Sequence, residues 1–204
     1  MMRRVLLLVA MMAVSLLVAS GVALAVTKIG TDGPDTLRGT NKADNLLGRG
    51  GNDVLFGKDG RDNLLGEEGK DVLIGGFEDG TGSGDKNLAG GSGNDFVLGA
   101  KGSDNIVGGA GNDFLVEDGL REFSKDTISG GSGNDVLDTW HRPAAAKDVV
   151  ACGSGFDRVI ADRADLVAPD CEKVVVVHGS LENMFDQADA FIQSIPESFF
   201  EGLP

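Results

Sequence analysis

A nine-residue repeat between Gly30 and Asp138 constrains the fold of this chain more than any other feature. Aspartate returns at every ninth position in three blocks, and an aliphatic residue follows two positions after each aspartate. The aspartates are Asp35, Asp44, Asp53, Asp62 and Asp71, then Asp95, Asp104 and Asp113, and finally Asp126 and Asp135. A fixed short period of this kind predicts stacked structural units in place of one central globular core.

Each copy divides into a glycine-rich turn of six residues and a strand of three. The best-preserved copies read GGSGNDFVL at residues 90–98 and GGAGNDFLV at residues 108–116. Glycine allows the positive φ angles of a tight turn. The aliphatic residue in the middle of each short strand points to one side. Stacked strands therefore collect these aliphatic side chains into a thin, continuous core.

The same stacking places the aspartates in columns along the turns. Carboxylates in a column repel one another, so a cation must neutralise them. Carboxylate oxygens and glycine carbonyl oxygens together make a flexible, all-oxygen site, which suits calcium better than zinc or copper. We therefore expect several Ca²⁺ ions, with the ten aspartates named above as ligands.

These copies resemble the RTX (hemolysin-type) nonapeptide, GGxGxDxUx, over eleven copies and just over half of the chain. The resemblance implies an all-β parallel β-roll of two nonapeptides per coil. It also implies that calcium lies between a turn and the equivalent turn two repeats later. Seven aspartate pairs meet this condition: 35/53, 44/62, 53/71, 71/95, 95/113, 104/126 and 113/135.

Three copies depart from the pattern, and the second copy does so through Lys42 at its fourth position. The sixth carries Lys86 at the expected aspartate position, after an insertion within residues 75–84. This ammonium group either marks an edge position without function or divides the metal array in two. The tenth copy begins with Glu117 in place of glycine and has Ser124 at the fourth position.

Residues 1–25 resemble a secretory signal peptide, with Arg3 and Arg4 before an apolar stretch and Ala23-Leu24-Ala25 as the cleavage site. An uncleaved membrane anchor is the alternative. Loss of the two arginines changes the net charge from −14 to −16, which about seven Ca²⁺ ions would nearly cancel. An acidic surface repels phosphate, so nucleic acid is not an expected partner. We expect a secreted, extracellular protein.

The repeat occupies residues 26–138, and residues 139–179 form degenerate terminal coils. Asp157 and Val159 keep the aspartate and aliphatic positions of a copy there. Cys152 and Cys171 are the only cysteines, and an isolated pair in an exported protein predicts a disulfide. Metal binding with His178 is the alternative. The segment 152–172 resembles the closing segment of secreted, actinobacterial-type RTX proteins.

Residues 180–204 form an amphipathic tail with a predicted helix from Ser180 to Ile195. Its apolar side contains Leu181, Met184, Phe185, Ala188, Phe191, Ile192 and Ile195. A solenoid needs its end covered, so we expect a short helical cap. A helix that binds a membrane surface or a protein partner is the alternative, although its polar side is acidic.

No catalytic motif is present. The chain has neither a zinc-protease HExxH nor a GxSxG nucleophile turn, and its only histidines are His141 and His178. We therefore expect a non-enzymatic, monomeric calcium-binding protein that folds on calcium and has a structural or interaction role. A cell-surface adhesive module and a calcium-dependent hydrolase are the alternatives, and any cell-surface or protein partner is unknown.

Overall fold

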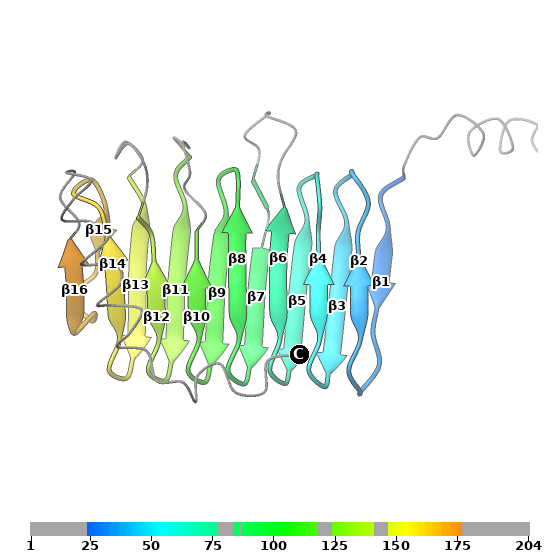
Figure 1. Cartoon of the computed structure of the whole chain (residues 1–204), viewed down its shortest axis with the longest axis horizontal. Coiled ribbons are helices and arrows are strands. Elements are labelled where there is room, and N and C mark those ends of the chain that lie inside the picture. Colours follow the sequence, from blue (N-terminus) through cyan, green and yellow to red (C-terminus); the bar gives the residue numbers. More distant parts are fainter. Residues whose placement is uncertain (1–23, 77–83, 86, 118–123, 141–146, 177–204) are drawn as a thin grey trace, which may run out of the picture.

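The computed structural model describes residues 24–76, 84–85, 87–117, 124–140 and 147–176. These residues form an elongated all-β solenoid (Figure 1), and none of them is helical. No helix able to span a membrane occurs in this part of the chain. Residues 1–23 of the predicted signal peptide lie outside the described residues. The predicted helical tail, His141 and His178 lie outside them as well.

Sixteen strands alternate between two parallel sheets of eight strands each. The odd sheet contains β1 (Thr27–Ile29), β3 (Asn45–Gly50), β5 (Asn63–Glu68), β7 (Asn87–Ser92), β9 (Asn105–Ala110), β11 (Thr127–Ser132), β13 (Val149–Ser154) and β15 (Leu166–Val167). The even sheet contains β2 (Thr36–Arg38), β4 (Val54–Phe56), β6 (Val72–Gly76), β8 (Phe96–Ala100), β10 (Phe114–Val116), β12 (Val136–Asp138), β14 (Arg158–Ala161) and β16 (Lys173–Val176).

One coil therefore consists of two nonapeptides, one strand in each sheet. The register keeps equivalent residues side by side: Leu46 pairs with Leu64 in the odd sheet, and Leu55 pairs with Leu73 in the even sheet. This arrangement confirms the expected parallel β-roll. Parallel pairing follows because every strand of a sheet is entered from the same edge, after the same kind of turn.

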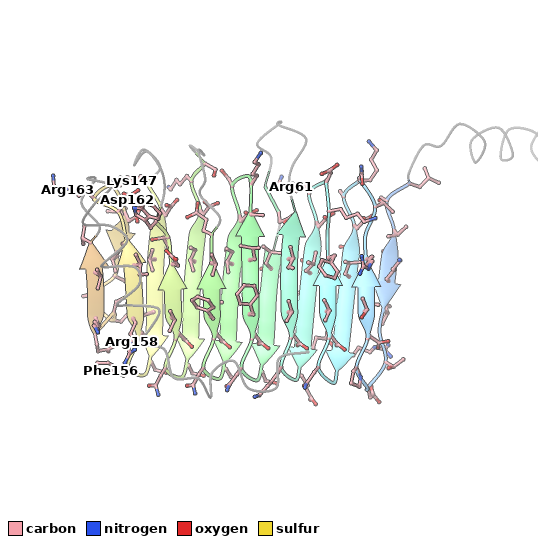
Figure 2. All side chains as sticks on the ribbon, viewed as in Figure 1. Arg61, Lys147, Phe156, Arg158, Asp162 and Arg163 are labelled. Atoms are coloured by element: carbon pink, nitrogen blue, oxygen red, sulfur yellow. A yellow bond between two sulfur atoms is a disulfide. The ribbon has the colours of Figure 1, made fainter. Side chains whose placement is uncertain are left out.

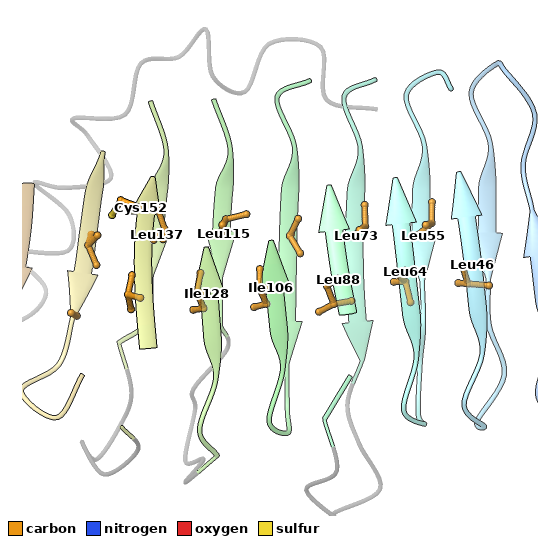
Figure 3. Close-up of a cluster of buried hydrophobic side chains, with 14 residues drawn as sticks. Leu46, Leu55, Leu64, Leu73, Leu88, Ile106, Leu115, Ile128, Leu137 and Cys152 are labelled. Carbon is orange, nitrogen blue, oxygen red and sulfur yellow. The ribbon is translucent and has the colours of Figure 1, made fainter. Parts of the chain in front are cut away.

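The core is a narrow band of aliphatic side chains between the sheets, with one row from each sheet (Figure 3). The second residue of each strand from β3 to β14 fills it, and Leu46, Leu64, Ile106, Leu115 and Leu137 have no exposed surface. Burial of one such side chain stabilises the fold by about 2 kcal/mol. Each strand contributes only one, so no coil buries enough apolar surface alone and every coil depends on its neighbours.

The two edges of the solenoid differ. We call the edge where odd strands lead into even strands the regular edge, because its turns between β1 and β14 all have the same length, as in residues 48–53 and 108–113. Only the last turn of this edge, from β15 to β16, is shorter. The opposite, irregular edge holds every insertion of the repeat. Figure 2 shows Arg61 and Lys147 at this upper edge and Phe156 at the lower, regular edge.

The two ends of the solenoid are also unlike. In the first coil, Lys28 stands beside Leu46 at the position that other strands fill with an aliphatic residue. Its Nζ donates to the carbonyl oxygen of Arg38 at 2.6 Å, which gives this end a polar surface. At the other end, β13 to β16 continue both sheets. A disulfide between Cys152 and Cys171 confirms the predicted pairing.

Candidate metal centre

Two columns of buried carboxylates run the length of the solenoid, one below each edge. The regular-edge column contains Asp35, Asp53, Asp71, Asp95, Asp113, Asp135 and Asp157. The irregular-edge column contains Asp44, Asp62, Asp85, Asp104, Asp126, Asp148 and Asp165. Each aspartate directly precedes a strand or lies two residues before it. The solenoid thus aligns all ten of the predicted ligands.

One oxygen of each carboxylate links adjacent coils. The backbone N–H of an aspartate donates to the Oδ1 atom of the aspartate one coil later, as from Asp95 to Asp113 at 2.9 Å and from Asp113 to Asp135 at 2.9 Å. The column ends where the N–H of Asp157 donates to Oε2 of Glu172 at 2.8 Å. These bonds hold every carboxylate in one orientation.

The second oxygen of these carboxylates, Oδ2, does not link coils on the regular edge. The Oδ2 atoms of six aspartates there are buried and have no hydrogen-bond partner, namely Asp53, Asp71, Asp95, Asp113, Asp135 and Asp157. A buried anionic oxygen without a partner is costly, because burial removes the water that solvated it. Six such oxygens in one column are a site that a bound cation would fit.

Backbone carbonyl groups lie beside these oxygens. A Cβ atom built on Gly130 would lie 2.5 Å from Oδ2 of Asp135 and 2.6 Å from the carbonyl oxygen of Cys152. Glycine at the first turn position therefore leaves room for two oxygens from different coils to approach each other. Oxygen ligands from carboxylates and carbonyls are those that Ca²⁺ prefers.

Most of the described turns have positive φ angles at their second and fourth residues. In the turn 108–113, Gly109 and Gly111 have φ values of 123° and 132°. Arg49 and Glu67 adopt positive φ at the second position of their turns, at 80° and 78°, although they carry side chains. Such backbone costs about 1 kcal/mol or more per residue, which indicates that stacking dictates the turn shape.

The RTX calcium-binding nonapeptide repeat matches the chain in four copies, at residues 29–64, 48–81, 80–115 and 124–140. Together these segments cover just over half of the sequence. The chain belongs to the RTX calcium-binding repeat family. No curated protein is significantly similar to the chain as a whole.

Calcium is the ion that RTX repeats bind, and the residues of this RTX chain fit it. The unpartnered Oδ2 atoms supply negative charge, and the glycine positions supply space and carbonyl oxygens. The seven aspartate pairs predicted from the sequence are all one coil apart. This holds also for the two pairs that span an insertion. The N–H of Asp71 donates to Asp95 at 2.8 Å, and the N–H of Asp104 donates to Asp126 at 2.5 Å.

The interpretation of Lys86 as the residue at the sixth aspartate position was wrong. Asp85 occupies that position: its Oδ1 accepts from the N–H of Asp62 at 2.8 Å, and its own N–H donates to Asp104 at 2.5 Å. Here one extra residue separates the aspartate from its strand, since Leu88 and not Asn87 pairs with Leu64. The carboxylate column is therefore continuous past the insertion, and Lys86 itself lies outside the described residues.

Further carboxylates were not predicted as ligands. Asp148, Asp157 and Asp165 extend the two columns beyond Asp135. Each stands two positions before an aliphatic residue, and this signal could have identified them without any glycine-rich turn. Glu117 was noted only as a departure from glycine.

Glu117 belongs to an additional carboxylate group on the irregular edge. One oxygen each of Glu117, Asp126 and Asp148 lie within 4.8 Å of one another, and all three residues are buried. Burial, and then the charge of Asp126, raises the pKa of Glu117. In this RTX chain the glutamate adds an acidic side chain where other turns have only a glycine.

Burial raises the pKa values of the column aspartates in the absence of metal. The pKa of Asp113 rises to about 8, because burial outweighs the hydrogen bond from the Asp95 N–H and the charges of Asp95 and Asp135 add to the shift. The pKa of Asp95 rises to about 7 and that of Asp71 to about 6, for the same first reason. Without metal, Asp113 therefore keeps its proton at neutral pH, whereas Asp71 is mostly ionised.

We therefore expect acid to stabilise the calcium-free protein. Folded carboxyl groups keep protons between the ordinary value of 3.8 and about 8, whereas the unfolded chain is ionised there. The folded state then binds more protons, so its stability falls as pH rises through this window. Far-UV circular dichroism of metal-stripped protein should show strand content that decreases from about pH 5 to about pH 8. A strand signal that increases with pH without calcium would contradict this.

Proposed function

We propose that this protein is exported and that calcium binding drives the folding of its β-roll, which then acts as a structural or interaction module without catalytic activity. The observation that carries the proposal is the column of buried Oδ2 atoms without hydrogen-bond partners on the regular edge. The metal-free columns concentrate negative charge in the interior, and a ligand that binds only the folded state stabilises it by mass action.

The proposed calcium ligands are the aspartates of both columns, together with carbonyl oxygens of the turns. The ten aspartates predicted from the sequence are retained in this set. Asp85, Asp148, Asp157 and Asp165 join them, because each continues its column in the same hydrogen-bonded arrangement. Glu117 is a further candidate through its proximity to Asp126 and Asp148.

Export is supported by two features. Residues 1–25 have the basic, apolar and small-residue order of a cleavable signal peptide. The disulfide between Cys152 and Cys171 suits an oxidising compartment. Extracellular calcium would then meet the chain only after it leaves the cell, which couples folding to secretion.

The non-enzymatic role is supported by the use of the carboxylates. Those in the columns are accounted for by coil-to-coil hydrogen bonds and by the proposed metal. RTX repeats are in general structural calcium-binding units.

Asp113→Asn tests the ligand assignment. Asparagine keeps an oxygen that can accept from the Asp95 N–H but removes the charge. We expect isothermal titration and native mass spectrometry to show at least one ion fewer than in the parent. Asp32→Asn is the matched control, because Asp32 is an exposed aspartate outside both columns. Equal calcium binding by the Asp113 variant and the parent would reject the assignment. Equal losses in both variants would indicate nonspecific attraction by net charge.

A further inference from the structure

The outer face of the even sheet is apolar across four consecutive strands. Side chains alternate between the core and this face, so β4, β6, β8 and β10 each place two residues outward. The eight residues are Val54, Phe56, Val72, Ile74, Phe96, Leu98, Phe114 and Val116. All are half-buried, and the ring centroids of Phe96 and Phe114 are 5.7 Å apart. A continuous apolar patch on a soluble surface indicates a contact surface.

The outer face of the odd sheet is less apolar. One of its two outward rows contains Leu47, Leu65, Ala89, Val107 and Ser129, but the other consists of polar residues, namely Asn45, Asn63, Asn87, Asn105 and Thr127. Nδ2 of Asn105 donates to Oδ1 of Asn87 at 3.0 Å within this row. The two sheets share one repeat and one core, so their difference is specific to the outer surface.

The outer face of the even sheet is not flat. An apolar hollow is lined by Phe56, Ile74 and Leu98 near the irregular edge. Towards the last coils, Trp140 packs on Val136 and Ile160, which are only 5% and 4% exposed. This part of the sheet already has an aromatic cover. The part that the described residues leave uncovered is the one formed by β4 to β10.

We propose that the C-terminal segment of the same chain, residues 180–195, packs its apolar side on this face. The last described strand, β16, belongs to the even sheet, and 28 residues follow Val176. A helix of 16 residues is about 24 Å long. In the even sheet β16 lies three strands beyond β10, and six strand spacings of about 4.8 Å, or about 29 Å, separate it from β4. Residues 177–179 can span about 10 Å, so this linker and the helix together are long enough to reach across the face to β4.

Charge favours this occupant over a second copy of the chain. Residues 177–204 contain five acidic residues and no lysine or arginine. Cations lie on both sides of the apolar face. Arg38 is on the adjacent β2, with its guanidinium carbon 4.8 Å from the centroid of the Phe56 ring, and Arg158 and Lys173 are on β14 and β16, two and three strands beyond β10. The acidic side of the tail can approach these cations, whereas two copies of the face would bring like charges together.

Docking on the face differs from capping the last coil. The open end offers a smaller apolar surface, chiefly Leu166 and Val174, which are 51% and 39% exposed. The predicted apolar side of the tail has seven residues over four turns, and the eight outward side chains of the sheet match it better in number. The inference does not depend on which residues bind calcium.

Limited proteolysis of the full chain in calcium tests the proposal, with fragments identified by mass spectrometry. The parent should resist cleavage within residues 180–195. The triple variant Val54→Thr, Val72→Thr and Val116→Thr keeps side-chain shape and strand preference but makes the face polar. We expect its tail to be cleaved at least tenfold faster. Asn63→Thr with Asn105→Thr is the control on the odd sheet and should protect the tail as the parent does.

Each outcome decides the question. Rapid tail cleavage in the parent would overturn docking of any kind, and an equally protected tail in the triple variant would place the tail on the last coil or elsewhere. A parent that is dimeric in light scattering, and becomes monomeric in the triple variant, would assign the face to a second copy. Circular dichroism in calcium checks that all variants fold. If the triple variant is unfolded, Val72→Thr with Val116→Thr repeats the comparison.

Discussion

Removal of calcium is expected to convert the protein from a strand-rich solenoid to a largely unfolded chain. The chain has a net charge of −14, and fourteen aspartates stand in the two columns only one coil apart. Without metal, the buried carboxylates must either take up protons or repel one another. Each strand adds only one buried aliphatic residue, so the core is too thin to offset this cost. Exhaustive chelation at about pH 8 should abolish the strand signal in circular dichroism, and millimolar calcium should restore it.

Matched salt conditions separate binding from screening. Potassium chloride screens exposed charges over about 10 Å at 0.1 M but does not coordinate buried oxygens. We expect potassium at equal ionic strength to restore little structure, and magnesium less than calcium, because Mg²⁺ requires a smaller and more regular set of ligands. A strand signal that survives chelation would show that the columns are stable without metal.

Substitution of Gly111 by alanine is expected to disrupt calcium-dependent folding. Gly111 has a φ of 132°, and a Cβ atom there would overlap the carbonyl oxygen of Gly93 on the preceding coil. The backbone strain alone costs about 1–3 kcal/mol, and separation of the two coils would add the loss of core contacts. The midpoint of thermal unfolding in calcium should fall by more than about 10 °C, since about 1 kcal/mol shifts it by 2–4 °C in a chain of this size.

Gly33→Ala provides the matched comparison. Gly33 occupies the same turn position in the first coil, but its nearest neighbour to a new Cβ atom is Oγ1 of Thr31 at 3.9 Å, and its φ is not in the left-handed region. We expect this variant to melt with the parent. Similar losses in both variants would mean that glycine serves turn flexibility in general, and that coil stacking does not impose the requirement.

The repeat made the fold predictable because one local rule recurs. An aspartate followed by an aliphatic residue two positions later locates both the carboxylate column and the core, and it holds from Asp35 to Asp157. The rule failed at Asp85, where an extra residue precedes the strand. Counting positions along the sequence cannot show that Asp85 stays in the column. The hydrogen bond from the Asp62 N–H to Asp85 keeps it there, and the extra residue is accommodated between Asp85 and the strand.

Features that depend on several coils were harder to predict from the sequence. The inequality of the two edges arises because insertions fall only in turns that lead from even to odd strands, and this becomes visible once strands are assigned to sheets. The approach of Glu117 to Asp148 joins residues from adjacent coils across an irregular turn. The apolar outer face likewise depends on sheet assignment, since Phe96 and Asn105 hold equivalent positions in successive copies but face opposite sides of the molecule.

The lysine in the first coil limits how this solenoid can grow. Parallel strands with regular register expose edges that can accept a further coil, including one from another molecule. A molecule added before β1 would have to bury the Lys28 ammonium in line with Leu46, where the aliphatic file runs. It would also have to replace the contact of this ammonium with the Arg38 carbonyl oxygen. Burial of the Lys28 ammonium would therefore oppose end-to-end association of solenoids at the first coil.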